Sequence, residues 1–114
     1  MVKIYHNPRC SKSRNSFNYL KEKGIDFETV EYLKTPPTKE EIKELLKKLG
    51  IQAKDLIRKG EAIYKEQFKG KELSNDEWIE AMVQYPKLIE RPIIVKDDKA
   101  VIGRPLENVE KLFE

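Results

Sequence analysis

The 114 residues are enough for one domain with a single core, and we expect one domain over residues 1–114. Hydrophobic residues make up 39% of the chain, and no apolar run approaches the roughly 20 residues of a membrane span. The net charge of +3 comes from 23 basic and 20 acidic residues mixed along the chain, which argues against nucleic-acid binding.

The chain has a single cysteine, Cys10, which excludes an internal disulfide and a multi-thiolate zinc site. Its first residues show no apolar signal segment, and a lone thiol is easiest to maintain in a reducing compartment. We therefore expect a cytoplasmic monomer with no bound metal and no membrane partner.

The first third of the sequence predicts a strand, a helix and a second strand. Residues 2–5 form the first strand, residues 11–23 have helical spacing and end before Gly24, and residues 26–33 alternate as the second strand. Short connections between them predict a right-handed unit with two parallel strands. Cys10 then lies where the first strand meets the helix.

The middle of the chain is predicted to be helical. Thr38 with Glu41 and Ser74 with Glu77 are capping boxes that open two amphipathic helices. Short helical turns are expected around Leu56 and Tyr64. Together these segments predict a helical insertion at about residues 38–90.

The last part of the chain predicts a hairpin and a final helix. Residues 93–95 and 100–102 are apolar strands around a turn at Asp97-Asp98, and Pro105 is placed to start the last helix. The order β-α-β, insertion, β-β-α predicts an α/β protein with a four-stranded mixed sheet. This is the thioredoxin-like plan.

Arginine is scarce in a chain rich in lysine. The 23 basic residues are 18 lysines and five arginines, which are Arg9, Arg14, Arg58, Arg91 and Arg104. A guanidinium grips oxyanions through a planar fork of donors, which a lysine ammonium lacks. Each arginine is a candidate for oxyanion binding, with ordinary surface charge as the alternative.

The neighbours of Cys10 favour a reactive thiol over a small buried core residue. Arg9, Lys12 and Arg14 surround it, and it lies at a helix start, where free N–H groups favour negative charge. Such surroundings lower a thiol pKa from about 8.5 into the range of roughly 3.5–7.5. The same N–H groups also suit a tetrahedral oxyanion.

Two further residues restrict the chemistry. His6 is the only histidine and either supports the thiolate or is an exposed loop residue without a role. Position 13 is Ser, so no Cys-x-x-Cys pair exists and an external thiol must complete each cycle. A cysteine phosphatase is disfavoured because Ser16 stands where its phosphate loop needs arginine.

The segment His6-Asn7-Pro8-Arg9-Cys10-Ser11-Lys12-Ser13-Arg14-Asn15 resembles the signature of the glutaredoxin-coupled arsenate reductases of the ArsC type. That signature is His-Asn-Pro-x-Cys-x-x-Ser-Arg-Asn. The resemblance continues through Tyr32-Leu33, Pro36-Pro37, Leu56-Ile57-Arg58-Lys59, Tyr64, Leu88-Ile89, Arg91-Pro92-Ile93 and Gly103-Arg104-Pro105. It covers almost the whole chain.

The resemblance implies a reaction and a set of site residues. Cys10 would attack arsenate, and His6 would lower the pKa of that cysteine. Arg58, Arg91 and Arg104 would hold the oxyanion, with Ser13 and Arg14 also in the substrate site. No cofactor would be bound; glutathione would act as co-substrate by forming a mixed disulfide with Cys10, and glutaredoxin would bind transiently to remove it. Arg91-Pro92 would be a cis peptide bond.

Two other functions remain open at this point. A redox-sensing transcription regulator of the same fold binds RNA polymerase, but it usually carries Cys-x-x-Cys, which Ser13 precludes here. A glutathione-dependent thiol reductase of the same superfamily would need Cys10 but not all three arginines. The retained Arg58, Arg91 and Arg104 therefore favour arsenate reduction.

Overall fold

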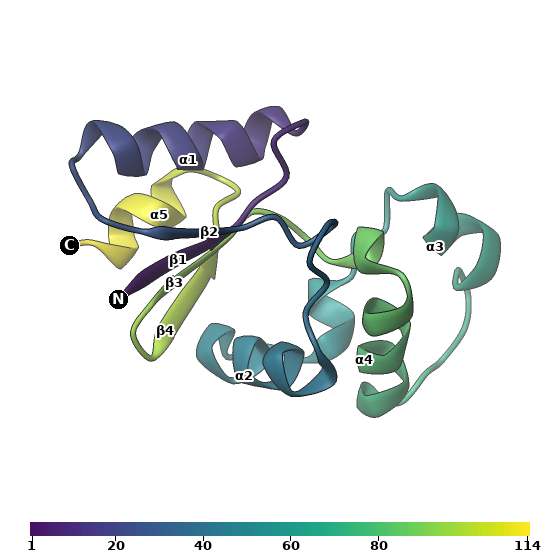
Figure 1. The fold of residues 1–114 in the computed structure, drawn as a ribbon. Helices are drawn as coiled ribbons and strands as arrows, with labels where there is room; N and C mark the ends of the chain where they lie inside the picture. The colour runs from purple at the N-terminus through teal and green to yellow at the C-terminus, as the bar shows by residue number, and fades with distance from the viewer. The chain divides into compact units, whose positions relative to one another are not determined.

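A computed structural model describes residues 1–114 (Figure 1). Its regular elements, in chain order, are β1 (Val2–Tyr5), α1 (Ser11–Glu22), β2 (Glu28–Val30), α2 (Lys39–Leu49), η1 (Ala53–Leu56), α3 (Ala62–Gln67), α4 (Asn75–Gln84), η2 (Pro86–Leu88), β3 (Ile93–Lys96), β4 (Lys99–Ile102) and α5 (Glu107–Leu112). The chain groups into two compact units. The sheet unit comprises residues 1–35 and 91–114, and the insertion unit comprises residues 36–90. One domain over the whole chain stays a prediction.

The sheet unit contains the predicted four-stranded mixed sheet. Its strand order is β2-β1-β3-β4, so β2 and β4 are the two edges. β1 pairs with β2 in parallel, whereas β3 runs antiparallel to both β1 and β4. The β-α-β and β-β-α halves of the sequence prediction are therefore confirmed.

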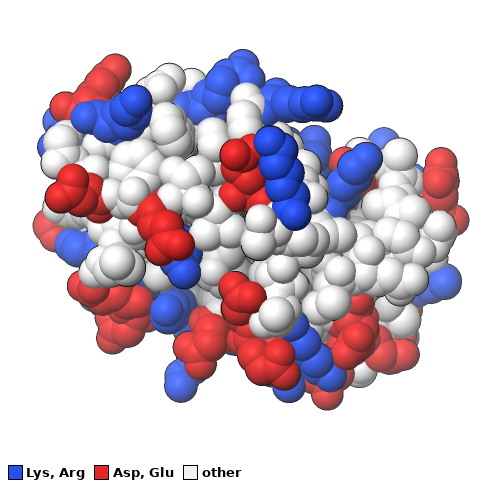
Figure 2. All heavy atoms as spheres, in the orientation of Figure 1, with Lys and Arg blue, Asp and Glu red and all other residues white.

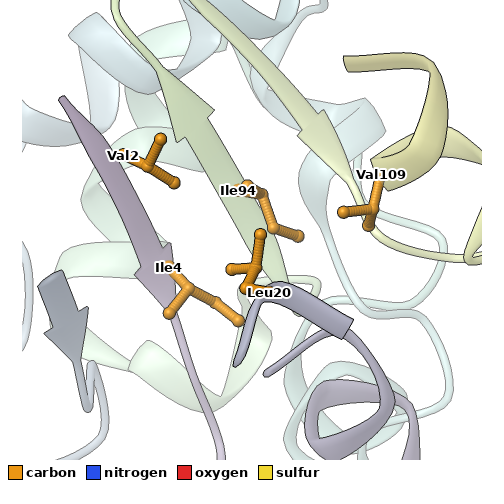
Figure 3. Packing of buried hydrophobic residues seen from close by; sticks show 5 residues of the cluster. All are labelled: Val2, Ile4, Leu20, Ile94 and Val109. Atoms are coloured by element: carbon orange, nitrogen blue, oxygen red, sulfur yellow. The ribbon is translucent and has the colours of Figure 1, made fainter. Parts of the chain in front are cut away.

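Helices α1 and α5 lie over one face of this sheet, as Figure 1 shows. The residues that join them to it are Val2, Ile4, Leu20, Ile94 and Val109, which form one buried cluster. In Figure 3 Leu20 from α1 and Val109 from α5 lie close to Ile94 of the central strand β3. Full burial of such a side chain contributes about 1.5–3 kcal/mol, so this cluster fixes α1, and with it the loop before α1, on the sheet.

The second strand is shorter than the sequence predicts. Residues 26–33 were expected to be extended, but β2 spans only Glu28–Val30, which pair with three residues of β1. After Glu31 the chain turns, because the carbonyl of Glu31 accepts hydrogen bonds from the N–H groups of Lys34 and Thr35. Alternation in the sequence does not reveal where a pairing partner ends.

The insertion unit begins and ends close to the predicted limits of residues 38–90. Thr38 with Glu41 caps α2, Ser74 with Glu77 caps α4, and both capping boxes are complete. Ile42, Leu45 and Leu46 bury one side of α2, and Trp78, Ile79 and Met82 bury one side of α4, as the helical spacing predicts. An isolated antiparallel bridge pairs Ile57, which follows η1, with Ile89, which follows η2.

The final helix starts later than predicted. Pro105 was expected to open it, but α5 begins at Glu107. The N–H groups of Asn108 and Val109 donate to the carbonyls of Pro105 and Leu106, three residues back, so the chain enters through a tighter turn. Both Arg91-Pro92 and Arg104-Pro105 are cis peptide bonds.

None of the helices combines the length and the apolar character needed to cross a membrane. Figure 2 shows acidic and basic side chains interspersed over the visible face, with no large area of one sign. This distribution agrees with the mixed charge along the sequence.

Gly103 is packed so closely that a methyl group has no room there. A Cβ atom at this position would lie 2.5 Å from Ser16 Oγ, 2.9 Å from Pro92 Cγ and 3.0 Å from Ile94 Cδ1. We expect Gly103→Ala to lower the free energy of unfolding by about 1–3 kcal/mol, because overpacking displaces buried neighbours. Chemical denaturation followed by circular dichroism measures this change.

Gly60→Ala is the matched control, because no atom lies within 4 Å of its Cβ position. It is expected to change the free energy of unfolding little or to raise it slightly. Equal stabilities of the two variants would contradict the packing argument at Gly103.

Candidate active site

Cys10 lies at the junction of a loop and a helix. It is the N-cap residue of α1, with extended backbone angles (φ −98°, ψ 124°), and its carbonyl accepts the first helical hydrogen bond from the N–H of Arg14 at 3.0 Å. The N–H of Cys10 donates to the carbonyl of Asn7 at 3.0 Å, which closes the loop before the helix. The half-buried thiol therefore stands at the exposed N–H groups of the first turn.

Several groups act on the ionisation of this thiol. Partial burial raises the pKa of Cys10, but hydrogen bonds from the backbone N–H groups of Ser13 and Lys12 lower it, as do the charge and a hydrogen bond of Arg91. The favourable contacts outweigh burial, and the pKa lies below its ordinary value. A thiolate is the nucleophilic form of cysteine, so the site favours the reactive state.

The lowered pKa predicts how alkylation depends on pH. Iodoacetamide reacts with thiolates, so the rate at Cys10 is expected to reach half its maximum at a lower pH than for free glutathione, an unperturbed thiol. Arg91→Ala removes a charge and a donor and should move that midpoint upwards. The measurement is the rate of mass increase by intact mass spectrometry across a pH series.

Arg9→Ala is the control for loss of a positive charge near the loop, because Arg9 is exposed and is not named above among the groups that shift the pKa of the thiol. Its midpoint should stay close to that of the parent. A midpoint that is the same in the parent, in Arg91→Ala and in free glutathione would contradict the proposed stabilisation of the thiolate.

His6 contacts the first turn of α1 through Ser13. Its Nδ1 lies 2.6 Å from Ser13 Oγ, and the same oxygen accepts a hydrogen bond from the N–H of Asn7 at 2.9 Å. Burial lowers the pKa of His6, the charge of Glu31 opposes this effect, and Arg14 adds to it. The lowered pKa favours the neutral ring, which stacks on Phe17 with 4.8 Å between ring centroids.

Ser13 connects this network to the thiol. Its side chain is fully buried and is held by His6 and Asn7, while its backbone N–H donates to the sulfur of Cys10. His6 is not among the groups that directly shift the pKa of Cys10. The histidine therefore contacts the residue whose N–H donates to the sulfur.

The arginines of the sheet unit have different surroundings. Arg91 is buried, with 7% of its surface exposed, and contacts Cys10. Arg14 is exposed and donates from Nη1 to the carbonyl of Pro8 at 3.0 Å, so it braces the loop. Arg104 lies between Gly103 and Pro105 and lines a surface hollow next to α1.

Arg58 belongs to the insertion unit. Its Nη1 lies 3.3 Å from Glu61 Oε2, and its N–H donates to the carbonyl of Leu88 at 2.7 Å. The sheet unit thus contains all the predicted site residues except Arg58, namely Cys10, His6, Ser13, Arg14, Arg91 and Arg104. No cluster of three or more His, Cys, Asp or Glu side chains suited to a metal ion occurs in the chain.

The sequence pattern of the ArsC family matches residues 5–112 of this chain. The chain is 53% identical over 110 residues to "Uncharacterized protein YfgD" of Escherichia coli K12, covering 95% of this chain and 92% of that protein. It is 46% identical over 114 residues to an arsenate reductase of Neisseria meningitidis, with 98% and 97% covered.

A solved structure of an arsenate reductase from Vibrio cholerae matches the fold with a TM-score of 0.92 at 45% sequence identity. The match covers 96% of this chain and 95% of that one. Together with the observed strand order, it confirms the predicted thioredoxin-like α/β fold.

Proposed function

The chain belongs to the ArsC family, and from this membership we propose that it reduces arsenate to arsenite through Cys10, with glutathione and glutaredoxin as electron donors. Relatives named arsenate reductase that align over nearly the whole chain support the reaction. The reducing cytoplasm, which supplies glutathione, is the compartment that this reaction requires.

The observation that carries the proposal is the surroundings of the Cys10 sulfur. The N–H groups of Ser13 and Lys12 and the guanidinium of Arg91 all stabilise negative charge at one point. A thiolate needs such donors before it reacts, and an arsenate oxyanion needs them when it binds. A single arrangement of donors therefore suits both the nucleophile and its substrate.

The proposed reaction transfers two electrons to arsenic. The Cys10 thiolate forms a sulfur–arsenic bond, and one arsenate oxygen leaves as water after protonation. The thiol of glutathione then attacks the Cys10 sulfur and forms a disulfide with it, while the sulfur–arsenic electron pair stays on arsenic. Arsenic is thereby reduced by two electrons and leaves as arsenite.

Each remaining site residue has a role in this proposal. Arg91 and Arg104 hold arsenate oxygens, and Arg58 is the third arginine that the family resemblance assigns to them. Ser13 places its N–H at the sulfur, and His6 holds Ser13 in position. Arg14 fixes the loop through its hydrogen bond to Pro8.

The requirement for glutaredoxin follows from the number of thiols. Because Cys10 is the only cysteine, the oxidised protein has no internal disulfide, which is the usual substrate of thioredoxin. Arsenate with glutathione but without glutaredoxin is expected to leave one glutathione on Cys10. Intact mass spectrometry detects this adduct.

A coupled assay tests the electron source. Arsenate-dependent NADPH oxidation is expected with glutathione, glutaredoxin and glutathione reductase together. Replacing glutathione and glutaredoxin by thioredoxin and its reductase should give little turnover. Full turnover with thioredoxin alone would show that another thiol resolves the enzyme and would refute the proposed coupling.

A further inference from the structure

A turn in the insertion unit brings a carboxylate to Arg58. The N–H of Glu61 donates to the carbonyl of Arg58 at 3.2 Å, and Oε2 of Glu61 lies 3.3 Å from Nη1 of Arg58. Both side chains are partly buried, with 32% of Arg58 and 20% of Glu61 exposed. This ion pair is therefore less screened by solvent than the pair between Lys39 and Glu80, which are 36% and 60% exposed.

The backbone of Arg58 is anchored in the core of the insertion unit. Its N–H donates to the carbonyl of Leu88 at 2.7 Å, and the bridge between Ile57 and Ile89 lies directly before it. Ile57, Leu88 and Ile89 are all buried. Because the backbone is held in this way, the direction of the long Arg58 side chain is what the contact with Glu61 can decide.

Glu61 does not use its carboxylate for the helix that it precedes. It is the N-cap residue of α3, yet its side chain makes no capping hydrogen bond, unlike Thr38 before α2 and Ser74 before α4. An ion pair that is partly exposed also adds little to the stability of the fold. Neither capping nor stability explains this carboxylate, so its contact with Arg58 points to a functional role.

Arg58 can bind an oxyanion through either of two forks of donors. One fork is formed by Nη1 and Nη2, and the other by Nε and Nη2. The contact with Glu61 is at Nη1, so it occupies the first fork and leaves the second for an oxyanion. A long side chain that is already held at one end also loses less freedom when it binds a ligand.

We propose that Glu61 is a positioning residue, which holds the guanidinium of Arg58 in the orientation that binds arsenate. Its effect on arsenate is exerted entirely through Arg58. This inference rests on the proposed function, which assigns Arg58 to the oxyanion. The alternative is competition, in which the negative charge of Glu61 opposes the oxyanion. The two roles predict opposite changes in arsenate affinity when Glu61 is replaced.

Protection of Cys10 from iodoacetamide by arsenate measures oxyanion binding without turnover, because glutathione is left out. Intact mass spectrometry gives the alkylation rate, and a series of arsenate concentrations gives the concentration at half-protection. Neither Arg58 nor Glu61 is named above among the groups that shift the pKa of Cys10. The rate without arsenate should therefore be the same in the parent and in the variants of these two residues.

Glu61→Ala is expected to raise the arsenate concentration at half-protection by roughly three- to tenfold, the effect of losing one charged contact. Glu61→Gln keeps an oxygen that can accept from Nη1 and should recover most of the affinity. Combined with Arg58→Ala, Glu61→Ala should cause no further loss, because both changes act on one guanidinium. Glu66→Ala is the matched control, since it removes the same charge from an exposed position of α3 and should equal the parent.

The outcomes separate this inference from the proposed function. Half-protection of Glu61→Ala at the same or a lower arsenate concentration than the parent would overturn the positioning role, even if the parent reduces arsenate. An effect of Glu61→Ala that persists in the Arg58→Ala background would also overturn it. Weaker protection in Glu61→Ala that Glu61→Gln recovers and Arg58→Ala cancels would support the role, even if the coupled assay shows no reduction. That failure would refute the proposed reaction only.

Discussion

Replacing Cys10 with serine is expected to abolish arsenate reduction and to leave the fold intact. The serine hydroxyl stays protonated at neutral pH and cannot form the sulfur–arsenic and disulfide bonds that the reaction needs. The coupled assay should lose activity by more than about 10³-fold, as is usual when a nucleophile that acts together with its partners is removed.

The fold should survive because Cys10 contributes little to packing. Its side chain is half-buried, makes no capping hydrogen bond and lies outside the buried cluster of the sheet unit. Circular dichroism and thermal unfolding should match the parent within error. Appreciable arsenate reduction by folded Cys10→Ser protein would rule out the proposed mechanism.

Replacing Arg91 with lysine is expected to cause the next largest loss. Arg91 is buried beside the sulfur, where its guanidinium offers a charge and a planar fork of donors. Lysine keeps the charge but not the fork, and loss of one oriented donor to a reacting oxyanion costs about 10²-fold in turnover. The coupled assay at saturating glutathione and glutaredoxin measures this loss.

Arg58→Lys and Arg104→Lys are expected to impair turnover as well, because the proposal assigns both residues to the oxyanion. Arg9→Lys is the comparison, since Arg9 is exposed and has no assigned role in binding arsenate; it should matter less. If the Lys variants of Arg58, Arg91 and Arg104 all match the parent, the arginines do not hold arsenate.

The elements that sequence reasoning predicts well are those fixed by neighbouring residues. Thr38 with Glu41 and Ser74 with Glu77 satisfy the first N–H groups of their own helices, and Gly50 ends α2 in the left-handed conformation. The length of β2 depends instead on how many of its residues pair with β1. The start of α5 depends on hydrogen bonds to carbonyls three residues back, which replace the first helical turn. Local patterns do not contain that information.

Some features of the candidate site could be predicted from the sequence, and others could not. The position of Cys10 at a helix start follows from the sequence, and the importance of Arg91 follows from a family resemblance. The contact between His6 and Ser13 depends on the path of the loop between them. A hydrogen bond from the N–H of Cys10 to the carbonyl of Asn7 closes this loop.

The two edges of the sheet have a consequence for how the chain behaves at high concentration. An unpaired edge strand is a template on which another chain can add, and long flat edges lead to aggregation. Here β2 offers three residues and β4 offers four, and both begin with an exposed charged side chain, Glu28 and Lys99. Edges this short and charged give an incoming strand few hydrogen bonds and a desolvation penalty, so the architecture opposes edge-to-edge polymerisation.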